Sequence, residues 1–362
     1  MRITFILPTA DMSGGTRVVA IYARALAARG HSVVIVCPPP QSIPVRTKIR
    51  SALTGNGWPQ DPTIAKSHLN GIDVPLRTLD RVRPVGDGDV PDADVVIATW
   101  WETAEWVAAL SPAKGAKAYF IQHHETFKYL PIARCRATYR LPLHKIVVAN
   151  WLKKVMHDEY NDGDVDLVHN SVSHEQFHAL VRNKQIVPTV GFLYHPTRFK
   201  GVDVTLKAIA LLGADFPDLR VISFGAHKPT RNFDQRVEFE LLPRQDKLRD
   251  LYAQCDVWLT ASRSEGFNLP AMEAMACRTP VVSTRTGWPE EAIENGVNGV
   301  LVDVDDAAAL ARGAAWALRL DNESWKRLSR AAYEAVEGSS WETATTNFER
   351  ALQRAYHKRA NC

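Results

Sequence analysis

The stretch that decides the fold runs from residue 257 to residue 283 and has the sequence VWLTASRSEGFNLPAMEAMACRTPVVS. Val257–Thr260 and Thr279–Ser283 are short apolar runs bounded by turn residues, which predicts two buried strands. Pro270 suits the first turn of a helix, where a missing N–H costs nothing, and strong helix formers follow it. The pattern therefore predicts strand, loop, helix and strand, the repeating unit of parallel α/β sheets.

Two carboxylates, Glu265 and Glu273, flank the loop and the predicted start of the helix. A helix start binds a diphosphate well because unpaired N–H groups and the positive end of the dipole point at it. Open α/β sheets bind ligands at the carboxyl ends of their strands, where this loop is expected. One carboxylate could then hold a ribose and the other a sugar. Either acid alone also fits a structural role, since an acid in a first helical turn stabilises the dipole.

Residues 265–276 have the sequence EGFNLPAMEAMA, which resembles the signature E-G-F-x-L-P-x-x-E-A-M-A of the retaining family 4 glycosyltransferases with the GT-B fold. The resemblance covers most of the chain, is specific in residues 257–302 and is loose between residues 40 and 90. It implies that Glu273 holds the ribose of a nucleotide sugar. It further implies that Glu265 orients the transferred sugar together with the backbone of Gly266, Phe267, Asn268 and Leu269.

Length and composition indicate an ordinary globular protein. A chain of 362 residues is long enough for about two domains. The five cysteines are scattered without a Cys-x-x-Cys pair, which predicts a reducing compartment and no zinc cluster. The apolar run Ile3–Leu7 is too short for a signal peptide and predicts a first strand. No apolar segment is long enough to span a membrane.

The rhythm of apolar runs and helical patterns predicts an α/β protein made of two parallel, doubly wound Rossmann-like domains. Strands are expected in both halves, at residues 3–7, 33–37, 95–99, 118–122, 145–149, 189–193, 219–224, 237–239, 257–260, 281–283 and 299–302. Helices are clearest at residues 16–29, 202–212, 246–253, 270–276 and 307–319. We expect an N-terminal acceptor-binding domain (1–175), a C-terminal donor-binding domain (176–340) and a last helix (341–362). The resemblance implies that the domains face each other across a cleft and that the last helix crosses back to the first domain, whereas sequence alone equally allows packing on the second.

Two glycines, Gly14 and Gly15, follow the first predicted strand and precede the first helix. Without side chains they let the backbone approach a ligand closely, although glycines are also common at such turns for steric reasons. The resemblance implies that this loop contacts the donor phosphate and the acceptor.

Arg198 and Lys200 lie just after the first strand of the second half. Two cations at the ligand edge of a sheet can neutralise the charge that develops on a departing diphosphate. Lys200-Gly201 fits the family frame, but Phe192 stands where many members have an arginine. Arg198 is therefore inferred as a substitute, and plain surface charge remains an alternative for it.

His123, His124 and Glu125 follow the predicted strand that ends at Gln122. The resemblance implies that a histidine here contacts the donor sugar and lines the acceptor site. His124 and Glu125 match best, with His123 as the second choice, and a structural histidine is equally compatible. Trp100 and Trp101 follow another strand and could form an acceptor platform by stacking, although core packing is more usual for large aromatics.

Two acidic patterns resemble metal sites, and we expect neither to bind a metal. Asp92 and Asp94 precede a strand, where aspartate serves as a turn residue. Asp162, Asp164 and Asp166 alternate but lack the calcium-loop frame with its terminal glutamate. The resemblance implies chemistry that requires no metal, and we expect no cofactor.

The function that these residues favour is transfer of a sugar from a nucleoside diphosphate sugar to a hydroxyl acceptor, with retention of configuration. The acceptor would be a glycan, a lipid-linked molecule or a small molecule, in bacterial surface polysaccharide or glycoconjugate synthesis. Two alternatives stay open: a nucleotide-sugar epimerase or hydrolase on the same scaffold, and a non-catalytic nucleotide-sugar-binding subunit.

Charge is distributed unevenly along the chain. Residues 1–160 carry 20 Lys and Arg against 13 Asp and Glu, while the whole chain has a net charge of only +4. A basic N-terminal half could face an anionic acceptor or an anionic membrane surface, and a solvated mixed surface is equally compatible. We expect a cytoplasmic protein that could touch the inner face of a membrane and that has no nucleic-acid partner.

Overall fold

The computed structural model describes residues 1–53, 57–61, 67–229, 233 and 236–360. The chain divides into two compact units. Unit 1 contains residues 1–169 together with the segment that starts at Glu342, and unit 2 contains Asn170–Trp341.

Unit 1 is built on a parallel sheet with strand order β3-β2-β1-β4-β5-β6-β7. Its strands are β1 (Arg2–Ile6), β2 (Ser32–Cys37), β3 (Leu76–Thr78), β4 (Val95–Ala98), β5 (Ala116–Ile121), β6 (His144–Val147) and β7 (Val165–Leu167). The central strands are buried on both faces, as expected for a sheet that helices cover on both sides. The three-residue edge strands β3 and β7 were not predicted, because neither has an apolar run long enough to stand out.

The helices of unit 1 are α1 (Gly14–Ala28), α2 (Val45–Leu53), α3 (Trp101–Ala109), α4 (Ile132–Thr138), α5 (Asn150–Tyr160) and α12 (Trp341–Ala360), with short 3-10 turns at Asp87–Asp89 and Pro112–Lys114. Helix α1 begins two residues before the predicted start. Ser13 is its N-cap, and the Ser13 hydroxyl accepts the N–H of Thr16.

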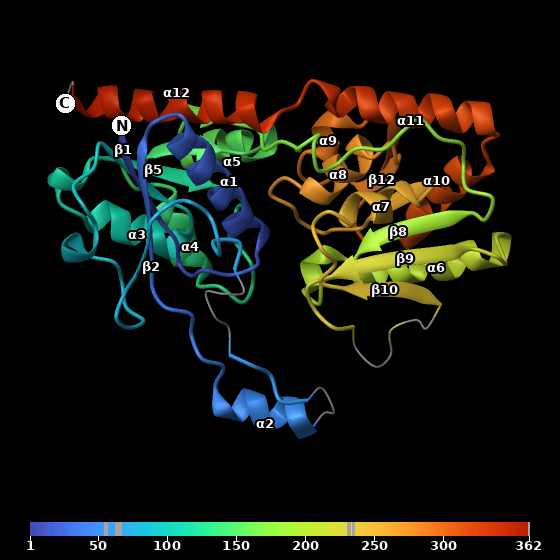
Figure 1. The fold of residues 1–362 in the computed structure, drawn as a ribbon, viewed down its shortest axis with the longest axis horizontal. Coiled ribbons are helices and arrows are strands. Elements are labelled where there is room, and N and C mark those ends of the chain that lie inside the picture. The colour runs from blue at the N-terminus through green and yellow to red at the C-terminus, as the bar shows by residue number, and fades with distance from the viewer. Residues whose placement is uncertain (54–56, 62–66, 230–232, 234–235, 361–362) are drawn as a thin grey trace. The chain divides into compact units, whose positions relative to one another are not determined.

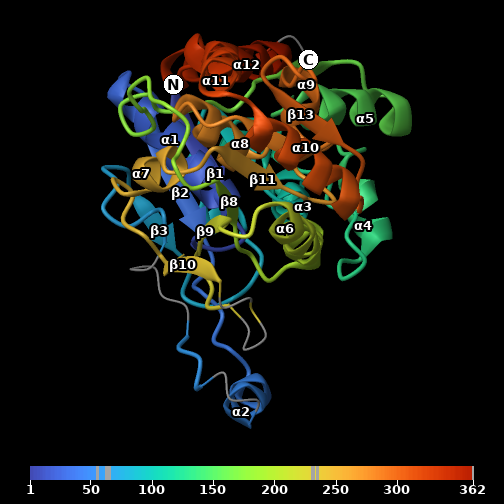
Figure 2. The same cartoon turned by 90° about the vertical axis from the view of Figure 1, so that its right-hand side faces the viewer.

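Helix α12 packs on unit 1, beside α1 and β5 (Figures 1 and 2). Phe348 is fully buried and its ring contacts those of Phe5, Tyr22 and Phe120. Glu349 adds ion pairs with Arg29 and His31 at 3.0 and 2.8 Å. The aromatic contacts place the last helix of the chain in the core of the unit that begins at residue 1.

Unit 2 is built on a second parallel sheet, with strand order β10-β9-β8-β11-β12-β13. Its strands are β8 (Thr189–Leu193), β9 (Arg220–Gly225), β10 (Val237–Leu241), β11 (Val257–Thr260), β12 (Val281–Thr284) and β13 (Gly299–Val302). Its helices are α6 (Val202–Asp215), α7 (Leu248–Ala253), α8 (Leu269–Ala276), α9 (Pro289–Ala292), α10 (Ala307–Arg319) and α11 (Asn322–Glu337), with a 3-10 turn at Arg198–Lys200. Helices α6 and α10 pack together over β8 and β11, and α8 packs against α7 and α11. Two parallel doubly wound sheets confirm the predicted fold class.

In the part of the chain that the structure describes, no helix is long and apolar enough to cross a bilayer.

Candidate functional site

The strand order of unit 2 reverses between β8 and β11, which are neighbours in the sheet but not in the sequence. At such a point the loops that leave two adjacent strands diverge to opposite sides, and open α/β sheets bind ligands in the gap. The loop after β8 carries Lys200, and the loop after β11 carries Glu265. The topology therefore brings together two residues that lie 65 positions apart in the chain.

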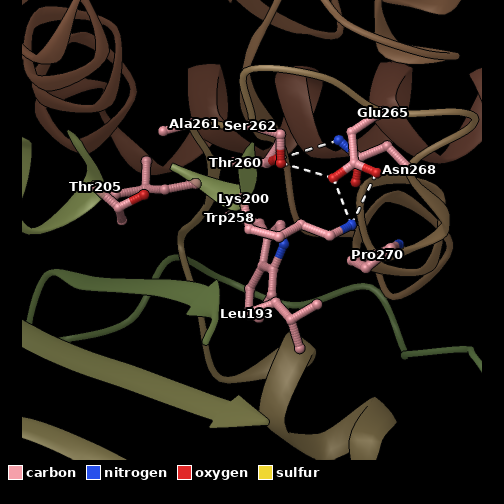
Figure 3. Close-up of a pocket in the computed structure, with 11 residues that line it drawn as sticks. Leu193, Lys200, Thr205, Trp258, Thr260, Ala261, Ser262, Glu265, Asn268 and Pro270 are labelled. Atoms are coloured by element: carbon pink, nitrogen blue, oxygen red, sulfur yellow. Dashed lines mark hydrogen bonds and ion pairs between the residues drawn. The ribbon is translucent and has the colours of Figure 1, made fainter. Parts of the chain in front are cut away.

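Lys200 and Glu265 form a two-pronged ion pair, in which the ammonium lies 2.8 Å from Oε1 and 2.9 Å from Oε2 of the carboxylate (Figure 3). The hydroxyl of Ser262 donates a further hydrogen bond of 2.6 Å to Oε1. Glu265 is 7% exposed, so water screens the pair only weakly. The three side chains line a small hollow, together with Leu193, Thr260, Asn268 and Pro270.

The loop that carries Lys200 is tied directly to the loop that carries Glu265. The backbone N–H of Arg263 donates to the carbonyl of Phe199 at 2.7 Å, and its guanidinium donates to the carbonyl of Arg198 at 2.6 Å. Asp203 and Asp305 hold the same guanidinium at 2.7 and 2.6 Å. This bracing keeps the cation-bearing loop against the carboxylate-bearing loop without a ligand.

Helix α8 starts where the sequence predicted a phosphate-binding helix start. Asn268 precedes it in the left-handed region, with φ 78°, a conformation that asparagine tolerates better than most residues. The Asn268 amide donates to the hydroxyl of Thr260 at 3.0 Å, which ties the turn to the end of β11. Phe267 is buried against Trp288, with ring centroids 5.8 Å apart. The turn is therefore fixed by packing, and the backbone of Gly266, Phe267 and Leu269 is fixed with it.

Glu273 lies in the second turn of α8 and is 3% exposed. The hydroxyl of Tyr252, on α7, donates to its Oε2 at 2.8 Å. The Tyr252 hydroxyl thus orients a buried carboxylate, a group whose two oxygens accept hydrogen bonds. This geometry suits the ribose-binding role that the sequence predicted.

Arg198 is exposed and lies two residues from Lys200, at the start of the same 3-10 turn. Within the described residues no ion pair of its guanidinium is recorded, and its carbonyl, not its side chain, is held by Arg263. Phe192, which stands where the family resemblance led us to expect an arginine, is buried in the core of unit 2. Arg198 is thus positioned to meet an anion beside Lys200, and this role stays a prediction.

His195 is a residue of this site that the sequence did not single out. Burial lowers the pKa of its imidazole to about 4, and the nearby charges of Lys200 and His227 act in the same direction. Its Nδ1 accepts the N–H of Thr197 at 3.2 Å, which leaves the proton of the neutral ring on Nε2. The imidazole is therefore a neutral hydrogen-bond donor near Lys200 at neutral pH.

This depressed pKa predicts a loss of stability in acid. Between pH 6.5 and 4 the unfolded His195 binds a proton that the folded one does not, so stability is full above pH 6.5 and falls as pH falls toward 4. The contribution is roughly 2 kcal/mol, after allowance for the part of the ring that water reaches. We expect His195→Gln to flatten the dependence of the unfolding free energy on pH in urea titrations at pH 7 and 5. The control is His178→Gln, which changes an exposed histidine and should keep the pH dependence of the wild type. If the unfolding free energy of the two variants changed equally between pH 7 and pH 5, the dependence could not be assigned to His195.

In unit 1 the Gly14–Gly15 turn forms the start of α1, directly after β1. The Asp11 carboxylate accepts hydrogen bonds from the Ser13 N–H and from the hydroxyls of Ser13 and Thr16, at 2.6 to 3.0 Å. A Cβ added at Gly14 would meet no atom within 4 Å, so its backbone faces open space. The Gln122 amide donates to the carbonyl of Gly15 at 3.2 Å, which fixes the turn against the end of β5. Gly14 therefore presents accessible backbone, whereas Gly15 is partly covered by the Gln122 side chain.

His123, His124 and Glu125 point in different directions. Nε2 of His124 hydrogen-bonds the hydroxyl of Tyr160 at 2.7 Å within a group of tyrosine rings, and burial lowers the pKa of His124. Glu125 is 2% exposed, accepts the first N–H of α3 from Trp101 at 2.9 Å, and has its pKa raised well above the usual value by burial. His123 instead lies beside Trp151, at the start of α5. This arrangement gives His123, His124 and Glu125 structural partners, and which histidine meets a ligand stays a prediction.

Trp101 is buried, whereas Trp100 is half-buried. Trp101 is 5% exposed in the first turn of α3, and the guanidinium of Arg134 lies over its ring at 4.9 Å. Trp100 is half-buried at the N-cap of the same helix. The environment of Trp101 is that of a core residue, which leaves Trp100 as the better candidate for an acceptor contact.

The aspartates of the two acidic patterns pair with basic side chains. Asp92 pairs with Lys114 and Asp94 with Arg2. In the alternating series, each aspartate contacts a base: Asp162 pairs with Lys145, Asp164 with Arg354 and Lys358, and Asp166 with His144 and Arg354. Among the described residues no group of three His, Cys, Asp or Glu side chains could hold a metal ion.

The sequence also predicted no role for Ser262, Arg263 and Tyr252. Arg263 and Tyr252 act through contacts between loops or helices that the folded sheet creates. Ser262 contacts Glu265 within one loop, but no sequence motif marks it. His195 had a local signal, because it lies in the same loop as Lys200, five residues before it.

Comparison with known proteins identifies the family. The model described as "Glycosyltransferase Family 4" matches residues 12–176, and the model described as "Glycosyl transferases group 1" matches residues 184–319. Only residues 1–11, 177–183 and 320–362 fall outside the two matches. The chain belongs to glycosyltransferase family 4. The family predicted from residues 265–276 is confirmed.

Among curated relatives, the D-inositol 3-phosphate glycosyltransferase of Arthrobacter sp. (strain FB24) is 36% identical over 166 residues, which cover 42% of this family 4 chain and 39% of that protein. N-acetyl-alpha-D-glucosaminyl L-malate synthase of Bacillus anthracis is 36% identical over 105 residues, covering 29% of this chain and 27% of that protein. The chain thus spans 39% or less of the length of these two relatives.

Solved structures show the same fold over nearly the whole chain. Anabaena HepE in complex with UDP and glucose superposes with a TM-score of 0.74 at 16% identity, over 98% of this family 4 chain and 99% of that chain. Sucrose-phosphate synthase from Thermosynechococcus elongatus gives a TM-score of 0.72 at 16% identity, over 99% and 100%. Both comparisons confirm the GT-B architecture of two Rossmann-like units.

Proposed function

We propose that the chain is a retaining glycosyltransferase that moves a sugar from a nucleoside diphosphate sugar to a hydroxyl acceptor. The observation that carries this proposal is the Lys200–Glu265 pair, held at the strand-order reversal of unit 2 beside the start of α8. Lys200 could pair with a diphosphate and Glu265 could accept a sugar hydroxyl, and the two side chains are in direct hydrogen-bond contact.

In this proposal the donor lies across the start of α8. Lys200, with Arg198 beside it and the backbone of Gly14 and Gly15, neutralises the diphosphate. Glu273 accepts the ribose hydroxyls, while Glu265 and the backbone of residues 266–269 orient the sugar. The predicted cleft between the units, in which these groups would act together, is part of the proposal.

The reaction breaks the bond between the anomeric carbon and the diphosphate oxygen and forms a bond from that carbon to the acceptor oxygen on the same face. The proton of the acceptor hydroxyl passes to the departing phosphate oxygen. Positioning and charge neutralisation supply the catalysis, so no carboxylate has to act as a nucleophile. Within the described residues Glu265 is paired with Lys200, and in this proposal Glu273 is engaged with the ribose.

A uridine diphosphate sugar is the first donor to test, because a crystal structure of Anabaena HepE holds UDP-glucose. For the acceptor, the relatives' names mention D-inositol 3-phosphate and L-malate, which are small anionic hydroxyl compounds. The basic first half of this chain suits an anionic acceptor, either small or lipid-linked. A role in bacterial surface polysaccharide or glycoconjugate synthesis stays a prediction.

The donor half of the proposal is tested by thermal-shift screening with UDP, GDP and dTDP sugars, since a ligand that binds the folded state raises the melting temperature. We expect one nucleotide class to stabilise the protein. Glu273→Gln should raise the dissociation constant of that nucleotide sugar about 30-fold, because hydrogen bonds to a charged acceptor make a net contribution of about 2 kcal/mol to binding. Tyr252→Phe removes only the hydrogen bond that orients Glu273 and should weaken binding less, about fivefold.

Stabilisation by no nucleotide sugar would contradict the proposal. Donor binding without turnover against any hydroxyl acceptor would favour the non-catalytic binding subunit. Conversion of the donor sugar in the absence of an acceptor would favour the epimerase or hydrolase.

A further inference from the structure

The two charged side chains at the centre of the site bind each other in the structure. The Lys200 ammonium lies 2.8 and 2.9 Å from the two oxygens of Glu265, and both contacts are drawn in Figure 3. In the proposed function the same ammonium meets a diphosphate, and the same carboxylate meets a sugar hydroxyl. A donor therefore has to displace an interaction that the protein makes within itself.

This exchange takes place in the side chains, because the backbone that carries Lys200 is braced. Arg263 donates to the carbonyls of Phe199 and Arg198, at 2.7 and 2.6 Å. The Lys200 side chain is 23% exposed, against 9% for the side chain of Glu265. Lysine carries its charge on a flexible four-carbon stem, so Lys200 can turn toward a ligand while Glu265 stays in place.

A nucleoside diphosphate without a sugar can replace only one side of the pair. Its oxygens take the place of the carboxylate at Lys200, and Glu265 loses its cation. Within the described residues the carboxylate then keeps the hydrogen bond of 2.6 Å from the Ser262 hydroxyl. Removing the partner of a nearly buried charge is unfavourable, and this unfavourable energy opposes the binding of the diphosphate.

A nucleotide sugar can replace both sides of the pair. Its diphosphate meets Lys200, and hydroxyls of its sugar donate to the Glu265 oxygens that the ammonium gives up. Hydrogen bonds to an ionised acceptor are stronger than those between neutral groups. The sugar thus compensates Glu265 for the cation that the diphosphate takes.

We propose that Glu265 competes with the diphosphate for Lys200 and thereby makes the site selective for a nucleotide sugar over the nucleoside diphosphate product. As long as the sugar is present, it holds the carboxylate, and Lys200 stays with the diphosphate. Once the sugar has been transferred, the carboxylate recaptures Lys200 and weakens the binding of the product. This inference rests on the proposed function and gives Glu265 a second role, in product release.

Dissociation constants for the two ligands test this competition. The probes are UDP and UDP-glucose, measured by isothermal titration calorimetry, or the GDP or dTDP equivalents if the thermal-shift screen selects that base. An apparent affinity is reduced by the fraction of molecules in which the binding group is available. Glu265→Gln removes the competing charge and keeps the shape, so UDP should bind about fivefold more tightly than to the wild type. The nucleotide sugar loses its charged acceptor at the same time, so the ratio of its affinity to that of UDP should fall about tenfold or more.

A second variant shows whether the effect arises from the pair or from the loss of one negative charge. Ser262→Ala leaves the charge of Glu265 unchanged but removes a hydrogen bond on which the carboxylate depends more once Lys200 has left. UDP should therefore bind about threefold more weakly to this variant. In a chain that also carries Glu265→Gln, Ser262→Ala should change the affinity for UDP by less than about twofold, because its effect passes through the carboxylate.

Glu290→Gln is the matched control, since it removes the charge of an exposed carboxylate of unit 2, and it should bind both ligands as the wild type does. Equally tight UDP binding by this control and by Glu265→Gln would assign the effect to net charge and overturn the inference. UDP binding that Glu265→Gln does not strengthen, or that Ser262→Ala does not weaken, would overturn the inference and leave the proposed function standing. A wild type that binds neither nucleoside diphosphates nor nucleotide sugars would contradict the proposed function itself, and the inference with it.

Discussion

Lys200→Ala should lower the turnover number for sugar transfer about a thousandfold, which corresponds to about 4 kcal/mol of lost transition-state stabilisation. Charge accumulates on the diphosphate as the bond to the sugar breaks, and Lys200 is the cation that the fold holds at that position. The loss should appear in steady-state kinetics mainly as lower kcat, because the interaction strengthens as the charge develops.

A second cost accompanies the lost cation. Glu265 is 7% exposed, and its carboxylate receives the ammonium on both oxygens. Without Lys200 the nearly buried carboxylate loses its cation and, within the described residues, keeps the hydrogen bond from the Ser262 hydroxyl, which is unfavourable. We therefore expect the melting temperature of Lys200→Ala to fall as well, and Glu265→Gln introduced in the same chain to recover part of that fall without restoring turnover.

Lys207→Ala is the matched control, since it removes an exposed lysine seven residues further on, in α6. It should leave kcat and the melting temperature unchanged. Turnover of Lys200→Ala within about threefold of the wild type would show that the pair is structural, because general positioning effects of a displaced catalytic group are far larger.

The residues that we propose for the donor side could be singled out from the sequence because most of them lie in one contiguous stretch. Glu265, the turn at residues 266–268 and Glu273 belong to a single strand-loop-helix unit, whose geometry follows from local rules. Lys200 was found because it follows a strand at the same sheet edge. What the sequence did not reveal is that Lys200 and Glu265 bind each other, since the contact depends on which strands are neighbours.

The first unit was harder, and the three residues at 123–125 show why. Successive residues after a strand point in different directions, and the sequence does not say which one a tyrosine hydroxyl or a helix start will capture. The Tyr160 hydroxyl hydrogen-bonds His124, and the first N–H of α3 donates a hydrogen bond to Glu125. Neither partner is near them in the sequence.

Gly201→Ala should destabilise unit 2 by about 3 kcal/mol or more and should also lower turnover about a hundredfold. Gly201 has φ 64°, a conformation that costs other residues about 1 kcal/mol or more. A Cβ at this position would also lie 1.9 Å from the carbonyl oxygen of Ala261, so one of the two loops has to move. Those loops carry Lys200 and Glu265, and a shift of about 1 Å is enough to impair a positioned catalytic group.

Gly30→Ala is the control that shows the effect of backbone strain without a steric clash. Gly30 has φ 85°, but an added Cβ would have no atom within 4 Å. It should cost only about 1 kcal/mol, with full activity. For domains of this size each kcal/mol lowers the melting temperature by about 2 to 4 °C. Gly201→Ala should therefore lower the melting temperature of unit 2, the transition that a bound nucleotide sugar shifts, by at least about 6 °C. Gly30→Ala lies in unit 1 and should lower the melting temperature of that unit by about 3 °C. Equal shifts for the two variants would mean that the loop at Ala261 yields freely, and the site would then lack the rigidity on which its positioning of Lys200 depends.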